Sequence, residues 1–173
     1  MASARSRGIR RAGGPVPLAV IGALLWGIAV HATAVETLDG TAVRILSGDT
    51  LEVGVGDRII ELRLADIGAP QGSEYYAPPA QTLLSNIALD QKLRVTVTGR
   101  SDAGGTYGRV SVGKLDVNLE LVRRGAAWVC WEYGAPSSLL PYETEAKRFQ
   151  RGLWVYTLEI DARVACKRRP PSP

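Results

Sequence analysis

Apolar and polar residues alternate over short stretches in the part of the chain that follows residue 35. Runs of this kind cover residues 42–46, 51–53 and 58–67, and the turn sequences Ser-Gly-Asp and Gly-Asp separate them. Alternating and β-branched runs favour strands, and short turns between such runs favour antiparallel neighbours. The pattern therefore predicts a three-stranded meander.

A helical spacing follows the Pro78-Pro79 pair. Apolar side chains recur there every three or four positions, which is the repeat of one face of a helix. Prolines suit the first turn of a helix, where a backbone N–H has no partner in any case. We expect a helix that runs to about Leu89. Its apolar positions are Ala80, Leu83, Leu84 and Ile87.

The remaining pattern predicts three more strands and two more helices. The strands are expected at residues 93–97, 107–112 and 126–131. A short helix is expected at 117–124 with Gly125 as its C-terminal cap, and a last helix at 142–151 that ends at Gly152 and buries Ala146 and Phe149. Residues 158–165 fit either a strand or a helix.

This order of elements predicts the fold class. About five strands with helices inserted between and after them indicate an α+β, mainly β protein. We expect a five-stranded closed barrel of the OB type with about three packed helices.

Residues 1–34 have the features of a targeting segment. Four arginines precede an apolar run at residues 16–30, and Ala32-Thr33-Ala34 has the small-x-small pattern of a signal-peptidase site. The run is short for a membrane span. We expect an exported protein, periplasmic or secreted, with cleavage after Ala34. The alternative is a retained N-terminal anchor.

The leader also accounts for the positive charge of the chain. The whole sequence has 21 basic and 17 acidic side chains, and the four charged residues of 1–34 are all arginines. Residues 35–173 are therefore formally neutral, and the basic pI does not indicate nucleic acid. Any attraction for phosphate would therefore have to come from local clusters of basic side chains. The run Lys167-Arg168-Arg169, with Arg163 nearby, is either such a cluster or a solvated Pro-rich tail.

Two cysteines and one histidine limit the chemistry. Cys130 and Cys166 both lie in the exported part, where an even pair favours a disulfide that would stabilise by about 3–4 kcal/mol. Two unpaired thiols are the alternative. The single histidine, His31, lies in the leader. The mature protein therefore has no histidine for catalysis.

Several polar residues stand out within the apolar pattern. Asp49 lies in the turn Ser47-Gly48-Asp49-Thr50, where such a residue commonly caps the backbone. Arg63 lies inside an apolar strand, and a half-buried guanidinium needs an anion such as a carboxylate or a phosphate. Its partner is either a ligand or one of the carboxylates of Glu52, Glu61 and Asp66.

The order of these residues is more specific than any one of them. It runs Gly-Asp-Thr-Leu, Leu-Arg-Leu-x-x-Ile-x-x-Pro, Tyr-Gly-Arg, Asp-Val-Asn-x-x-Leu-Val-x-x-Gly-x-Ala-Trp and Gly-Leu-Trp. This order, over about residues 42–154, closely resembles the staphylococcal nuclease (thermonuclease) family. The resemblance implies a thermonuclease-like OB-fold domain at 35–157, followed by a C-terminal extension at 158–173. In active members it implies calcium-dependent hydrolysis of DNA or RNA phosphodiesters.

The resemblance also implies roles for individual residues. Asp49 matches the first metal-binding aspartate, and Arg63 and Arg109 match the two arginines that grip the phosphate and its developing charge. Tyr107 matches a tyrosine beside the nucleotide phosphate. Trp131 and Tyr133 fall where the family places aromatic residues against a base, and such stacking tolerates any sequence.

Three positions depart from the family pattern. Gly68 replaces the second metal-binding aspartate, Gln71 replaces the glutamate proposed as general base, and Thr106 replaces a frequent lysine. Loss of a general base removes about 10²- to 10⁴-fold of rate. Asp66, two residues before Gly68, and Glu74, three after Gln71, are the candidate substitutes. Asp66 lies on the same strand face as Gly68, but strict alternation sets it on the face opposite Arg63 unless a bulge intervenes.

Three hypotheses follow for function. The leading one is an exported monomer that binds single-stranded DNA or RNA, or another phosphate-bearing anion, with a degenerate catalytic site and a weakened Ca²⁺ site. The second is an active calcium-dependent nuclease that uses Asp49 with Asp66 or Glu74. The third is a structural or protein-binding module.

Overall fold

The protein was analysed as a computed structural model, which describes residues 35–72, 74–101, 104–131, 134–155 and 166. The described residues belong to one compact unit, residues 34–173. Within them no helix is long and apolar enough to cross a membrane. The leader and the ambiguous segment 158–165 lie outside the described residues.

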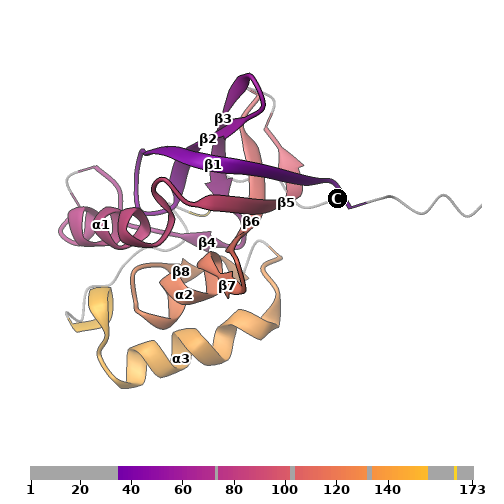
Figure 1. The fold of residues 1–173 in the computed structure, drawn as a ribbon. Helices are drawn as coiled ribbons and strands as arrows, with labels where there is room; N and C mark the ends of the chain where they lie inside the picture. Colours follow the sequence, from indigo (N-terminus) through magenta and orange to yellow (C-terminus); the bar gives the residue numbers. More distant parts are fainter. Residues whose placement is uncertain (1–34, 73, 102–103, 132–133, 156–165, 167–173) are drawn as a thin grey trace, which may run out of the picture. The chain divides into compact units, whose positions relative to one another are not determined.

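The first three strands form the predicted meander (Figure 1). β1 (Thr37–Ile45) pairs antiparallel with β2 (Thr50–Val55), which pairs antiparallel with β3 (Arg58–Leu64). β5 (Lys92–Arg100) joins the other edge of β1, and β6 (Thr106–Val112) follows it. The short β7 (Leu115–Asp116) extends this edge.

A parallel pairing closes the sheet into a barrel. β3 pairs with β6 so that Leu62, Arg63 and Leu64 face Thr106, Tyr107 and Gly108. The closure removes the two open edges that a five-stranded sheet would otherwise expose. The predicted five-stranded barrel of the OB type is confirmed, together with its α+β class.

Three helices pack on the barrel, as predicted. α1 (Ala77–Ala88) carries Pro78 and Pro79 in its first turn, and α2 (Val117–Arg123) has Asp116 as its N-cap. α3 (Leu140–Arg148) follows a 3₁₀ turn, η2 (Ser137–Leu139), and packs against α2 (Figure 1). A second 3₁₀ turn, η3 (Gly152–Val155), ends the continuous described part.

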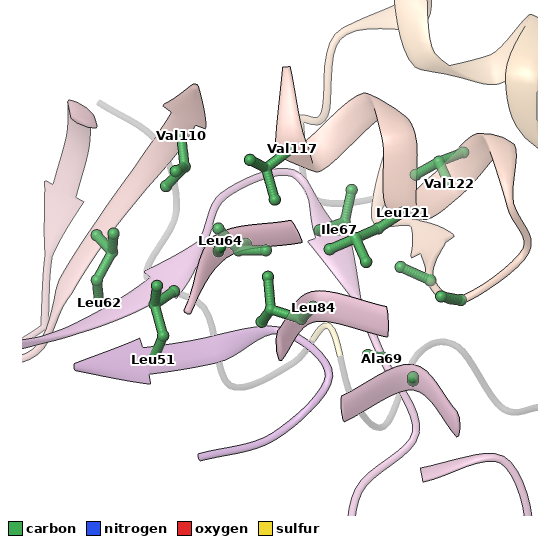
Figure 2. Close-up of a cluster of buried hydrophobic side chains, with 14 of the residues drawn as sticks. Leu51, Leu62, Leu64, Ile67, Ala69, Leu84, Val110, Val117, Leu121 and Val122 are labelled. Atoms are coloured by element: carbon green, nitrogen blue, oxygen red, sulfur yellow. The ribbon is translucent and has the colours of Figure 1, made fainter. Parts of the chain in front are cut away.

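The barrel interior and the helices share one apolar core (Figure 2). Leu51, Leu62 and Leu64 from β2 and β3 meet Leu84 of α1 and Leu121 of α2, and each is almost wholly buried. A second, smaller cluster consists of Trp128, Cys130, Leu153 and Cys166. The predicted disulfide between Cys130 and Cys166 is confirmed and lies in this second cluster.

Three sequence predictions need correction. The expected strand 58–67 ends at Leu64, because Asp66 has a φ of +70° and turns the chain before β4 (Ile67–Gly68). The expected strand 126–131 shrinks to β8 (Trp128–Val129), which pairs only with the two-residue β4. Phe149 is 59% exposed rather than buried, because α3 ends one residue before it.

Candidate functional site

Asp49 is the centre of the candidate site. It ends the turn between β1 and β2 and is fully buried. Its Oδ1 accepts hydrogen bonds from Ser47 Oγ at 2.8 Å, Thr50 Oγ1 at 2.9 Å and Gln71 Nε2 at 3.2 Å. Its Oδ2 accepts from Ala69 N at 3.1 Å and Arg63 Nη2 at 3.2 Å. An ionised carboxylate offers about four acceptor positions, so these donors fill it.

Close packing holds the Asp49 turn against the rest of the site. A Cβ atom on Gly48 would lie 2.7 Å from the Cβ of Ala80 and 2.8 Å from the Cβ of Ala69. Only glycine lets the turn approach α1 and the segment after β4 this closely. This approach brings Asp49 within hydrogen-bonding distance of the Ala69 amide.

Gln71 lies between two carboxylates. Its side-chain amide donates to Asp49, and its backbone N–H donates to Glu74 Oε2 at 2.8 Å. The segment after β4 therefore folds back, as it would have to if Glu74 were to replace a missing carboxylate of the site. The Glu74 carboxylate, however, caps the backbone of Gln71, and its side chain is exposed.

Arg63 forms an ion pair with Asp49. Strand register places it between Thr50 of β2 and Tyr107 of β6. Its Nη2 lies 3.2 Å from Asp49 Oδ2, and 17% of its side chain is exposed. The anion that a half-buried arginine needs is thus supplied within the protein.

Arg109 also forms an ion pair, with a residue that sequence reasoning did not assign to the site. Its Nη2 lies 2.7 Å from Asp116 Oδ2. The other oxygen of Asp116 accepts from Leu119 N at 3.0 Å and caps α2. The Asp-Val-Asn sequence could have indicated this N-cap, because aspartate is favoured at that position.

Asp66 lies in the turn between β3 and β4, not in a strand. It is buried, and its backbone oxygen accepts a hydrogen bond from Cys130 N at 2.9 Å. Strand alternation therefore does not decide which way the Asp66 side chain faces, because the left-handed turn breaks the alternation.

Gly68 is packed against the indole of Trp128. The two residues face each other in the β4–β8 pair. A Cβ atom on Gly68 would lie only 2.7 Å from Trp128 Nε1, and Trp128 is 2% exposed. A side chain at position 68 therefore requires movement of a buried indole.

Gly68→Ala should lower the free energy of unfolding by about 1–3 kcal/mol, the usual cost of overpacking a tight core. Urea denaturation measures this change. Gly99→Ala is the matched control, because a Cβ atom at Gly99 of β5 would meet nothing within 4 Å. Equal effects of the two substitutions would contradict the tight Gly68–Trp128 contact.

The residues present do not fit a calcium ion. Calcium takes six to eight oxygen ligands, largely from carboxylates and carbonyls. The described part of the chain has no group of three or more acidic, cysteine or histidine residues that could hold a metal. Asp49 already receives hydrogen bonds from hydroxyl, amide and guanidinium groups. Asp49 is instead held in a hydrogen-bonded network.

A cavity of about 350 Å³ lies next to Asp49. Polar groups line it from three strands and from the segment after β4, and they include both acidic and basic side chains. These polar residues include Ser47, Thr50, Glu61, Arg63, Gln71 and Tyr107. The predicted residues Arg63, Gln71 and Tyr107 are thus brought together, whereas Arg109 does not line the cavity.

Trp131, one of the aromatic residues predicted to contact a base, is exposed. It directly follows the buried Cys130, and 60% of it is exposed. Tyr133, predicted to stack on the same base, lies outside the described residues. Ser47 and Thr50, which hold Asp49, were not singled out from the sequence, since hydroxyl residues are common in any turn.

The sequence of the chain is similar to sequences of known proteins. The profile described as "Staphylococcal nuclease homologue" matches residues 61–156. The chain is 34% identical to "Micrococcal nuclease" of Shigella flexneri over 126 residues, which are 66% of this chain and 72% of that protein. It is 32% identical to an "Uncharacterized endonuclease" of Escherichia coli over 118 residues, 68% and 77% of the two chains. It is 30% identical to "Protein ParB" of Escherichia coli over 138 residues, 73% and 78%.

Proposed function

Because the chain belongs to the family of staphylococcal nuclease homologues, we propose that it binds single-stranded DNA or RNA through their phosphates and bases and hydrolyses them weakly or not at all. The observation that carries the proposal is the state of Asp49. Its carboxylate is buried, and hydrogen-bond donors occupy its acceptor positions.

The chemistry of Gln71 supports loss of hydrolysis. A carboxamide has no basic site near neutral pH, so it cannot take a proton from water. Its Nε2 donates to Asp49, which requires the amide and not a carboxylate at this position. The side chain thus works as a structural donor where the family has a base.

The binding half of the proposal rests on the cavity and on Trp131. Arg63 and Tyr107 line the cavity, and Trp131 offers an exposed ring on which a base can stack. Stacking on one aromatic residue contributes about 1–3 kcal/mol and tolerates any base. We therefore expect binding without strong sequence preference.

Export is part of the proposal. The leader-like residues 1–34 precede a domain at 35–157, and the disulfide joins this domain to the extension at 158–173. Disulfides persist in oxidising compartments. We propose a monomer in the periplasm or outside the cell.

An active nuclease is the second candidate. The printed names of the relatives, "Micrococcal nuclease" and "Uncharacterized endonuclease", favour it. In this chain it would have to use Asp49 with Asp66 or Glu74 around calcium.

The test compares the protein with its Gln71→Glu variant on denatured DNA, with calcium or with a chelator. We expect slow or no cleavage by the wild type and tight enough binding to measure by fluorescence anisotropy. Gln71→Glu would place a carboxylate about 3 Å from that of Asp49, so it should lower the melting temperature in chelator, and calcium should restore it.

Two outcomes would overturn the proposal. Chelator-sensitive cleavage by the wild type would establish the active nuclease, and neither cleavage nor binding would favour a structural or protein-binding module. The Gly68→Asp/Gln71→Glu double variant tests whether restoring both carboxylates of the family pattern restores cleavage. Its unfolding must be checked first, because the Trp128 indole has to move.

A further inference from the structure

The cavity next to Asp49 contains a carboxylate to which the proposed function assigns no role. Among the described residues that line this cavity, the charged ones are Arg63 and Glu61, both from β3. In the proposed function, Arg63 is the cation of the cavity that attracts phosphate. Glu61 has the opposite charge and repels phosphate. A strand that enters the cavity must therefore offer Glu61 a hydrogen-bond donor to gain from it.

In the described part of the chain, no cation on a neighbouring strand pairs with Glu61. Its cross-strand neighbour on β2 is Glu52, and both oxygens of Glu52 accept hydrogen bonds from Arg44. On the β6 side the paired register begins one residue later, at Leu62 and Thr106. Two carboxylates directly opposite each other in a sheet are unfavourable unless something neutralises them. The Glu61 side chain is exposed, so its oxygens are accessible to a ligand in the cavity.

Glu61 and Arg63 lie two residues apart on the same face of β3. Leu62 between them points into the barrel and is fully buried. Residues at this spacing along a strand are about 6.6 Å apart. The spacing suits two adjacent groups of one nucleotide better than its two ends. The sugar hydroxyl is next to the phosphate in a strand, whereas the edge of the base is at the far end of the nucleotide. A phosphate at Arg63 therefore brings a sugar close to Glu61.

We propose that Glu61 accepts a hydrogen bond from the 2′-hydroxyl of the nucleotide whose phosphate contacts Arg63, so that the cavity prefers RNA to DNA. The inference rests on the proposed binding of single strands and names the class of nucleic acid. An ionised carboxylate is only an acceptor, and the 2′-hydroxyl is a donor that DNA lacks. With DNA the Glu61 charge remains beside the phosphates without a donor to offset it.

The experiment measures binding of three fluorescent oligonucleotides of equal length to the disulfide-bonded protein. They consist of uridine, deoxyuridine or 2′-O-methyluridine, and anisotropy is followed in chelator at one salt concentration. The wild type should bind the uridine strand about tenfold more tightly than the deoxyuridine strand, the low end for a hydrogen bond to a charged group. The methylated strand keeps the RNA type of sugar but has no donor there, so it should bind like the deoxyuridine strand.

Two substitutions of Glu61 test its role through the ratio of RNA to DNA affinity. Glu61→Ala should bring this ratio close to one, although affinity for every strand rises because a charge that repels phosphate is lost. Glu61→Gln keeps an uncharged acceptor and should leave an intermediate ratio. Asp57→Ala is the matched control, because it removes the same charge from an exposed position in the turn between β2 and β3. It should keep the wild-type ratio.

The outcomes separate this inference from the proposed function. If the wild type binds none of the three strands, both are overturned. Equal wild-type affinity for the uridine and deoxyuridine strands overturns the inference alone, and so does a ratio that survives in Glu61→Ala. A methylated strand that binds as tightly as the uridine strand would assign the preference to sugar conformation. An equal fall of the ratio in Asp57→Ala would assign it to net charge, and either result overturns the role of Glu61.

Discussion

Replacing Asp49 with alanine should lower the free energy of unfolding by about 3–5 kcal/mol, the typical cost of removing one partner of a buried ion pair. The substitution leaves the Arg63 guanidinium without its carboxylate in a position that is 17% exposed. It also removes the carboxylate to which the Ala69 amide and the Gln71 carboxamide donate. Urea denaturation of the two proteins measures the difference.

The sign of the stability change in Asp49→Ala also distinguishes a structural role of this carboxylate from a role as metal ligand. In a site of clustered carboxylates without metal, removal of one relieves repulsion and stabilises the protein. Asp57→Ala is the control, because Asp57 lies exposed in the turn between β2 and β3 and should change stability by no more than about 0.5 kcal/mol. A more stable Asp49→Ala variant, or a wild-type melting temperature that rises with calcium, would contradict the hydrogen-bonded network.

The elements that depend on local signals could be predicted from the sequence. The β1–β2–β3 meander follows from alternation and two short turns, and α1 follows from its apolar spacing and its prolines. α2 begins and ends close to its predicted bounds because Asp116 caps it and Gly125 follows it. Each of these signals lies within a few residues of the structure it specifies.

Features that depend on distant parts of the chain could not be predicted in this way. The parallel β3–β6 pairing closes the barrel across more than forty residues of sequence. The turn at Asp66 has no glycine to mark it, and a left-handed aspartate is set by its surroundings, here by β4 and β8. Phe149 follows the helical period of α3 but lies beyond the helix end.

In the candidate site, too, individual residues could be predicted from the sequence, whereas their contacts could not. The resemblance identified Asp49, Arg63 and Gln71, and the structure brings Arg63 and Gln71 within hydrogen-bonding distance of Asp49. Sequence reasoning treated Gln71 only as a lost base. It did not show that the amide donates to Asp49, because hydrogen-bond partners 22 positions apart depend on the folded backbone. The structure therefore adds a role that the sequence did not reveal, the hydrogen bond from the Gln71 amide to Asp49.

Cys130→Ala/Cys166→Ala should lower the free energy of unfolding by about 4 kcal/mol in the chain-entropy model for a loop of 36 residues. The bond restrains the unfolded chain, and in the folded protein it keeps Cys166 buried in the second apolar cluster. Urea denaturation measures the change, and the wild type in reductant should unfold at the same urea concentration as the double variant.

The partners of Cys166 in this cluster show why the effect should also be local. Trp128 and Leu153 are almost fully buried there, and Trp154 packs against them. Without the disulfide, only these apolar contacts hold Cys166, since the cluster is separate from the main core. Limited proteolysis of the variant should therefore cut after residue 155 before it cuts the barrel. If the free energy of unfolding fell by less than about 1 kcal/mol and proteolysis were unchanged, packing alone would retain the C-terminal extension. Such a small decrease lies outside the range expected for removal of a native disulfide.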